Sequence, residues 1–129
     1  MSLTVRDASL DDIDRILAID RAYSPVFAKA ASYQRLLTGA GVVILATRAD
    51  AICGLAACSR VLDEATLLNL VVVPPARGQG AARQLLSALL HRLGDSQVAR
   101  LLLEVRESNL IAQSLYQSAG FKRDGHRTN

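Results

Sequence analysis

The stretch "VVVPPARGQGAARQLL" (71–86) constrains the fold more than any other part of the sequence. It begins in an apolar run typical of a buried strand, and Pro74 and Pro75 end that strand because proline cannot donate to a β ladder. A leucine-rich pattern over 79–93 predicts a helix that stops at Gly94. The apolar face of this helix carries Leu85, Leu86, Leu89, Leu90 and Leu93. The sequence therefore predicts a buried strand that passes into a helix through a glycine-bearing turn.

The other elements follow from their apolar periodicity and turn residues. The predicted strands are 3–8, 42–48, 51–61, 65–73, 98–105 and 121–126, and the predicted helices are 9–23, 29–41, 79–93 and 109–120. The order β-α-α-β-β-β-α-β-α-β combines an antiparallel meander with a βαβ crossover. It predicts an α/β (α+β) fold with a mixed sheet and helices on both faces. In the first helix Ser9 is the expected cap, and the apolar face continues to either Ile19 or Asp20.

Composition narrows the class of protein. The 129 residues suit one domain, and no repeat or linker divides them. Half the residues are hydrophobic but only 4% are aromatic, so the core should be aliphatic. A net charge of +3 without a dense basic run argues against a direct nucleic-acid partner. The absence of a long apolar run and of a signal-like N-terminus predicts a cytoplasmic protein with no membrane partner.

Two cysteines, Cys53 and Cys58, are spaced unlike a CxxC metal or redox pair. We interpret them as small core residues in a reducing compartment. No metal site is predicted.

The turn between the strand and the helix has the features of an anion site. Free N–H groups and the helix dipole both favour an anion at a helix N-terminus. Gly78 and Gly80 allow positive φ and close approach of the backbone to a ligand. The pattern from Arg77 to Ala82 is Arg-x-x-Gly-x-Ala, which is neither the P-loop nor the GxGxxG spacing. The alternative interpretation is an ordinary glycine-rich connector.

This pattern resembles the acetyl-CoA pyrophosphate loop of the GNAT acyltransferase superfamily. The segments "LDEATLLNLVVVPPARGQG", "LLLEVRESN" and "SLYQSAGF" resemble the RimI-type ribosomal-protein alanine N-acetyltransferases within that superfamily. The resemblance covers nearly the whole chain. It implies a single GNAT domain over 1–129 and acetyl-CoA as cosubstrate.

The resemblance also implies which residues bind acetyl-CoA. The diphosphate would be held by the loop and the first helical turn, the pantetheine arm by the backbone of the preceding strand, and Asn109 would contact CoA while also serving as a helix cap. The residues implied besides Asn109 are Leu70, Val71, Val72, Arg77, Gly78, Gln79, Gly80, Ala81, Ala82 and Arg83. Pairing with the arm requires the strands 65–73 and 98–105 to splay apart.

Glu104 ends an otherwise apolar strand, and burying it unpaired would be costly, so we expect it to face a cleft at the same end of the sheet. An α-amine has a pKa near 7.7–8.0 and must lose a proton before it can attack a thioester. Tyr116 lies two helical turns after Asn109, and its phenol is protonated at neutral pH. The resemblance makes Glu104 the proton acceptor and Tyr116 the proton donor. The alternatives are a surface ion pair of Glu104 with Arg106 and a core-edge role for Tyr116.

The implied reaction is acetylation of a protein N-terminus, and the implied target is the N-terminal alanine of the eighteenth small-subunit ribosomal protein. The alternatives are a GNAT enzyme acting on a small amine or another protein, and a CoA-binding module without turnover. Asp63 and Glu64 either attract a basic peptide or form a solvated turn.

The sequence departs from the RimI-type pattern in three places. Ala82 stands where glycine is commoner, and it is small enough to be tolerated. Residues 23–27, "YSPVF", replace a tryptophan-bearing acceptor loop, and the strand expected after 121–126 is missing. An open sheet edge there could pair with a second copy of the chain.

Overall fold

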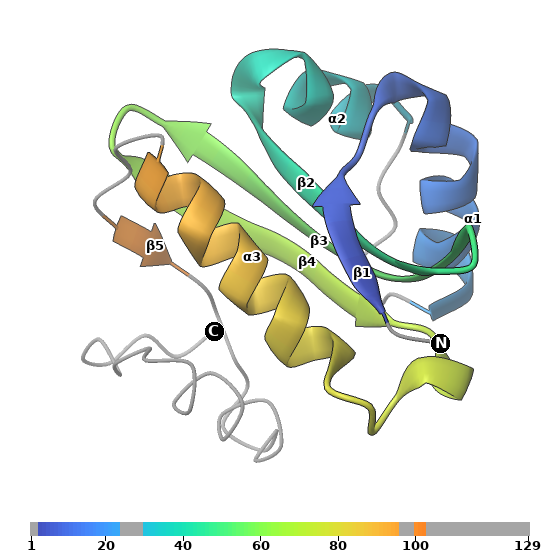
Figure 1. Ribbon diagram of the computed structural model, residues 1–129. Helices are drawn as coiled ribbons and strands as arrows, with labels where there is room; N and C mark the ends of the chain where they lie inside the picture. The colour runs from blue at the N-terminus through green and yellow to red at the C-terminus, as the bar shows by residue number, and fades with distance from the viewer. Residues whose placement is uncertain (1–2, 24–29, 96–99, 103–129) are drawn as a thin grey trace.

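A computed structural model describes residues 3–23, 30–95 and 100–102 (Figure 1). Its five strands form one sheet in the order β1-β2-β3-β4-β5. The first four pair antiparallel, and β5 runs parallel to β4. The strands are β1 (Thr4–Asp7), β2 (Gly41–Arg48), β3 (Ala51–Val61), β4 (Glu64–Val72) and β5 (Arg100–Leu102). The predicted mixed sheet is confirmed.

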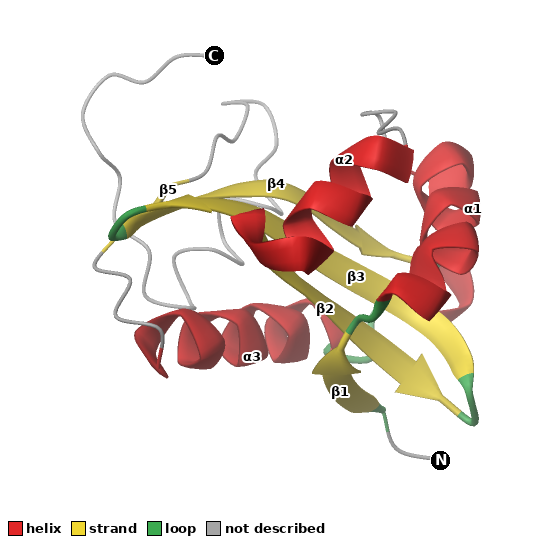
Figure 2. Cartoon of the chain, turned by 90° about the horizontal axis from the view of Figure 1, so that it is seen from above, coloured by secondary structure: helices red, strands yellow, loops and turns green. Residues whose placement is uncertain are grey.

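The described residues form three α-helices besides the sheet. They are α1 (Ile13–Tyr23), α2 (Ala30–Arg35) and α3 (Ala81–Asp95). Short helical turns precede or follow them at η1 (Leu10–Asp12), η2 (Leu36–Ala40) and η3 (Pro74–Ala76). Figure 2 shows α1 and α2 on one face of the sheet and α3 on the other, as the sequence predicted. The predicted helix 109–120 and strand 121–126 lie outside the described residues.

Several element boundaries differ from the prediction. The first helix begins as the 3₁₀ turn η1, and Asp20 rather than Ile19 completes its buried face. Helix α3 starts two residues later than predicted because Gly80 still has positive φ. It also continues through Gly94 to Asp95 instead of stopping there. The hairpin at Ala49 and Asp50 turns through two residues with positive φ, 50° and 70°, which matches the twist of the flanking strands.

Each face of the sheet buries its own hydrophobic cluster. The cluster under α1 and α2 comprises Ile13, Ile16, Leu17, Tyr33, Leu36, Val43, Leu45, Leu55, Ala57 and Val71. The cluster under α3 comprises Ile44, Ala46, Ala56, Cys58, Ala65, Leu85, Leu89 and Leu93. Both clusters are almost wholly aliphatic, which confirms the prediction from composition. Cys53 and Cys58 are buried free thiols, as expected.

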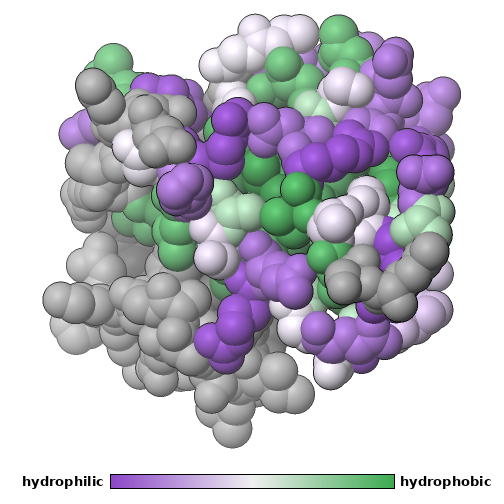
Figure 3. Space-filling model, in the orientation of Figure 1, coloured by the Kyte–Doolittle hydropathy of each residue, from purple (hydrophilic) through white to green (hydrophobic). Residues whose placement is uncertain are grey.

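The surface of the described residues carries both hydrophilic and hydrophobic side chains. Figure 3 shows hydrophilic side chains over much of the described part of one face, with hydrophobic atoms visible between them near its centre. No helix in the described ranges is long and apolar enough to cross a membrane. The same ranges contain no group of three or more His, Cys, Asp or Glu arranged to hold a metal ion.

Strand β4 carries a β-bulge at Leu68. Ala57 opposes Asn69 and the next pair is Cys58 with Leu67, so Leu68 has no partner on β3. Bulges bend a strand and often occur next to active sites. This bulge lies between the part of β4 that pairs with β5, which begins at Glu64, and the end of β4 that leads to α3.

Candidate active site

The turn after β4 is held by its own backbone. Val73 donates its N–H to Cys53 O (2.9 Å), which extends the pairing with β3 by one residue. The following turn η3 is closed by bonds from Ala76 N–H to Val73 O (2.9 Å) and from Arg77 N–H to Pro74 O (3.2 Å). Ala76 is buried and anchors the turn to the body of the protein. The chain therefore enters the Gly78–Gly80 segment from a fixed position.

Gly78 and Gly80 have φ of +78° and +82°. Apart from the adjacent residues in the chain, no described residue has an atom within 4 Å of the place where a Cβ would sit on either glycine. Glycine is thus favoured at these positions by the backbone conformation and not by lack of space. The prediction of positive φ at this turn is confirmed.

The first turn of α3 presents free N–H groups. The first bond of the helix runs from Gln84 N–H to Gly80 O (3.0 Å), so the N–H groups of Ala81, Ala82 and Arg83 have no acceptor within the helix. Within the described ranges, no side-chain oxygen accepts a hydrogen bond from them. Ala81 is buried, which fixes the turn against the sheet. With the helix dipole, this arrangement fits a doubly charged phosphate group.

Beyond Thr66, one edge of β4 presents backbone groups that no described strand pairs with. Val73 is bonded to Cys53, and Gly54 opposes Val72. Because backbone bonding alternates along an antiparallel pair, Leu70 and Val72 turn their N–H and C=O away from β3, while those of Val71 face it. Arg77 already uses one of these groups, since its Nε donates to Val72 O (2.9 Å). The predicted pairing of Leu70, Val71 and Val72 with pantetheine stays a prediction.

Gly54 on β3 lets both β4 and α3 approach β3 closely. A Cβ there would lie 2.8 Å from Val71 O and 3.1 Å from Leu85 Cδ1. The absence of a side chain at this position therefore allows Leu85 of α3 to pack closely on β3.

The residues expected to transfer protons lie outside the described part of the chain. These residues are Glu104 and Tyr116. Asn109, expected to contact CoA, and Arg106, the alternative ion-pair partner of Glu104, also lie outside it. The parallel pairing of β4 and β5 is described only as far as Thr66 with Leu102. The expected splay of the two strands therefore stays a prediction.

A polar cluster that sequence reasoning missed is buried beside the bulge. Tyr33 on α2 donates its hydroxyl to Asp20 Oδ2 on α1 (2.6 Å). The Asn69 amide on β4 lies 3.5 Å from the same carboxylate oxygen and 3.4 Å from the Tyr33 hydroxyl. Asp20 has no exposed surface, and among the described residues its Oδ1 has no hydrogen-bond partner. Burial, reinforced by the bond to Asp20, raises the pKa of Tyr33 well above its usual value, so the phenol remains a donor.

A second missed feature joins β2 to the loop. Arg48, the last residue of β2, donates from its guanidinium to Gln79 Oε1, and Gln79 Nε2 donates to Pro75 O (3.1 Å). The side chain of Gln79 is therefore folded back on η3. Only the fold brings Arg48 to this place, because 31 residues separate it from Gln79.

The mixed sheet with helices on both faces and the glycine-bearing turn before α3 are typical of proteins of the GNAT class. The sequence model of the acetyltransferase (GNAT) family matches residues 11–121, and the chain belongs to this family.

Its relatives narrow the class further. A [ribosomal protein bS18]-alanine N-acetyltransferase of Haemophilus ducreyi is 48% identical over 83 residues, which are 64% of this chain and 57% of that protein. The enzyme of the same name from Escherichia coli is 49% identical over 69 residues, 54% of this chain and 47% of its own length. The chain thus spans about half the length of these relatives. A protein of Bacillus subtilis named as a putative member of the same group is 31% identical over 127 residues, 97% of this chain and 84% of that protein.

Solved structures agree with the sequence matches. The crystal structure of the ribosomal-protein-S18-alanine N-acetyltransferase from Escherichia coli superposes with a TM-score of 0.85 at 30% identity, covering 95% of this chain and 79% of that one. The aminoglycoside acetyltransferase AAC(6')-Iy, solved with a CoA-containing bisubstrate analogue, has a TM-score of 0.81 at 19% identity, covering 95% and 92% of the two chains. The second likeness shows the fold alone.

Proposed function

We propose that this protein is an acetyl-CoA-dependent N-acetyltransferase that acts on a protein N-terminus, with the N-terminal alanine of a small-subunit ribosomal protein as its target. One observation carries the proposal. In a chain of the GNAT family, two glycines with positive φ lead into a 15-residue helix whose first N–H groups are free. The names of the relatives support the choice of acceptor. The cytoplasm, where ribosomal proteins are made, is the proposed location.

The residues of the loop and the β4 edge suit the two halves of acetyl-CoA. The N–H groups from Gly78 to Arg83 would hold the diphosphate, and the outward backbone groups of Leu70 and Val72 would pair with the amides of the pantetheine arm. When bound, acetyl-CoA supplies an activated acetyl group. Asn109 is proposed to add a further contact to CoA.

The acceptor amine must be neutral to react. Glu104 is proposed to take its proton, directly or through a water molecule. Because the reference pKa of glutamate is near 4.3, this role requires either a raised pKa or a relay through water. Tyr116 is proposed to protonate the departing thiolate, since its phenol carries a proton at neutral pH.

The direct test is an acetylation assay. A peptide that begins with alanine is incubated with acetyl-CoA and this chain, and mass spectrometry follows the addition of one acetyl group. The same peptide with a blocked N-terminus is the control. Acetylation of a polyamine but not of the peptide would favour the small-amine alternative. Binding of acetyl-CoA without product would favour a module without turnover. Glu104→Gln and Tyr116→Phe should lower kcat while CoA binding survives.

The loop itself is tested with a matched pair of glycine variants. Gly80 and Gly94 both have open space around them, but only Gly80 has positive φ. Gly80→Ala should strain the loop and weaken acetyl-CoA binding measured by calorimetry. Gly94→Ala places the better helix former inside α3 and should leave binding unchanged. Equal affinities of the two variants would argue against the loop as the binding site.

A further inference from the structure

The arginines of this chain differ in what their guanidinium groups contact. Arg6 and Arg15 both pair with Asp12, at 2.9 and 3.0 Å, and Arg92 pairs with Asp7 at 2.9 Å. Arg48 has no such partner in the described ranges. It donates to the neutral amide oxygen of Gln79, and its Nε is buried without a hydrogen-bond partner in the part of the chain that the structure describes.

An unpaired buried donor on a charged group is costly. A guanidinium carries five N–H donors and remains charged at any ordinary pH. Leaving one of them buried and unsatisfied costs more than a neutral donor would, because the group is charged. A phosphate oxygen is a stronger acceptor than an amide oxygen, and guanidinium groups bind phosphate through two parallel bonds. The donors of Arg48 are therefore matched to an anion that the described residues do not supply.

The position of Arg48 identifies the anion. Its partner Gln79 stands between Gly78 and Gly80, whose segment leads into the free N–H groups of α3. Arg77 on the same loop also donates to a neutral acceptor, Val72 O. Two guanidinium groups that no described carboxylate pairs with, Arg48 and Arg77, thus border the segment that the proposed function assigns to a diphosphate.

We propose that Arg48 is a phosphate-binding residue of the cosubstrate site, which exchanges the Gln79 amide oxygen for a phosphate oxygen of CoA. This inference rests on the proposed function, because it needs CoA at the Gly78–Gly80 loop. It adds a contact from the end of β2, which β3 separates from β4 in the sheet. Nothing in the local sequence around Arg48 marks it for this role.

The test is calorimetric titration of the full chain with acetyl-CoA. Arg48→Gln should weaken binding about tenfold or more, because a hydrogen bond between charged groups is lost. Arg48→Lys keeps the positive charge but loses the planar, two-pronged guanidinium. Its affinity for acetyl-CoA should therefore lie between those of the wild-type chain and Arg48→Gln. Arg35→Gln is the matched control, since it removes the same charge from an exposed position on α2. Thermal unfolding of each variant shows that the protein is folded.

Salt dependence separates a direct contact from a structural one. If Arg48 contacts a phosphate, its loss should make the affinity for acetyl-CoA less sensitive to salt, as for other polyanion ligands. If Arg48 only supports the loop, the slope of log affinity against log salt concentration should equal that of Arg35→Gln. Titration with 3′-dephospho-CoA then locates the contact. An equal loss with this ligand places Arg48 on the diphosphate, and no loss places it on the 3′-phosphate.

Two results would overturn the inference. One is an Arg48→Gln affinity for acetyl-CoA within twofold of both the wild-type chain and Arg35→Gln. The other is a loss of affinity in Arg48→Gln whose dependence on salt concentration is the same as that of Arg35→Gln. Failure of the wild-type chain to bind acetyl-CoA at all is a distinct result, which rejects the proposed function and this inference together.

Discussion

The two faces of the sheet bury different kinds of side chain. Under α3 the cluster contains only Ile, Ala, Leu and Cys side chains, and the helix contributes Leu85, Leu89 and Leu93. Under α1 and α2 the apolar cluster is interrupted by polar groups. Asp20 is fully buried there, hydrogen-bonded to Tyr33 and close to Asn69.

This difference has a physical consequence. Apolar packing is non-directional, so the α3 face tolerates changes of shape better than changes of volume. Hydrogen bonds among buried groups are directional, and a broken one leaves a desolvated atom behind. The α3 face fixes how closely the helix start approaches β4, while the polar cluster fixes α1 and α2 to β4 in one arrangement, next to the bulge at Leu68. The two faces should therefore respond differently to substitution.

The largest expected effect is on the apolar face. Leu89→Ala removes a side chain with no exposed surface and should lower the free energy of unfolding by about 2–5 kcal/mol. Urea denaturation measures the loss. Leu89→Met, which conserves volume, should cost less than about 1.5 kcal/mol. If the two variants lost similar amounts of unfolding free energy, side-chain volume alone would not determine the stability of this face.

The polar face should be sensitive to changes that conserve shape. Tyr33→Phe removes only the hydroxyl that donates to Asp20 and should cost about 1–3 kcal/mol, because the buried carboxylate loses its short hydrogen bond. Asp20→Asn should cost a similar amount. The double variant should lose less than the sum of the two, with a coupling of at least about 0.5 kcal/mol. Strict additivity in urea denaturation would show that the two residues do not act as one unit.

The sequence predicted the apolar face well and the polar face poorly. Leu85, Leu86, Leu89 and Leu93 follow the helical period, and the glycines at 78 and 80 mark the turn, so α3 and its loop could be inferred locally. The Asp20 cluster and the Arg48 contact join segments that are far apart in the chain. No local pattern encodes such contacts, because they exist only after the sheet has formed. The sequence could not decide whether Ile19 or Asp20 lies on the buried face of the first helix, and only the three-dimensional structure does.

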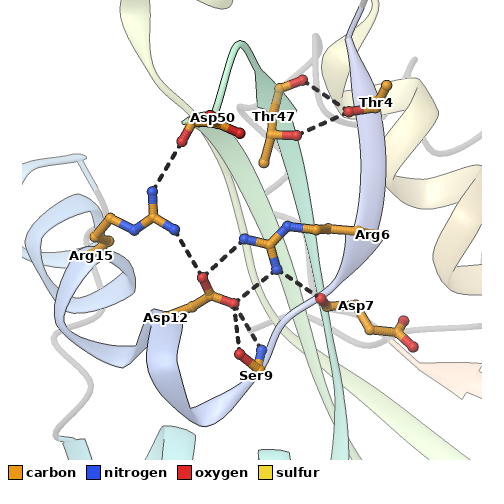
Figure 4. A network of polar contacts seen from close by, with 8 residues as sticks. All are labelled: Thr4, Arg6, Asp7, Ser9, Asp12, Arg15, Thr47 and Asp50. Carbon is orange, nitrogen blue, oxygen red and sulfur yellow. Dashed lines mark hydrogen bonds and ion pairs between the residues drawn. The ribbon is translucent and has the colours of Figure 1, made fainter.

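The α1 side carries a second polar network, at the entry to the helix (Figure 4). The Asp12 carboxylate accepts bonds from Arg6 (2.9 Å at each oxygen), from Ser9 N–H (2.8 Å) and from Arg15 (3.0 Å). The bond to Arg6, more than the others, holds the pKa of Asp12 far below its usual range, although burial opposes this shift. Ser9, the expected cap, therefore uses its N–H as a donor to Asp12.

This network predicts a pH dependence on the α1 side. Because the pKa of Asp12 is lower in the folded protein than the reference value near 3.9, its stabilisation is complete above about pH 5 and is lost as the pH falls below about 4. The loss should be on the order of 1 kcal/mol, since both arginines are about half exposed. Thermal unfolding between pH 6 and pH 2 measures it. Asp12→Asn should show a flatter profile than the wild-type chain, and equal profiles would contradict the assignment.

The smallest expected effect concerns the polar contact that links α3 to β1. Arg92 and Asp7 pair at 2.9 Å, but their side chains are 49% and 50% exposed. Water screens such a pair, and the cost of ordering two side chains offsets most of the attraction. Arg92→Ala should therefore change the free energy of unfolding by less than about 0.5 kcal/mol, and raising the salt concentration should change it little further. A loss above about 1 kcal/mol would mean that the α3 face also depends on a polar contact, and the contrast between the faces would then fail.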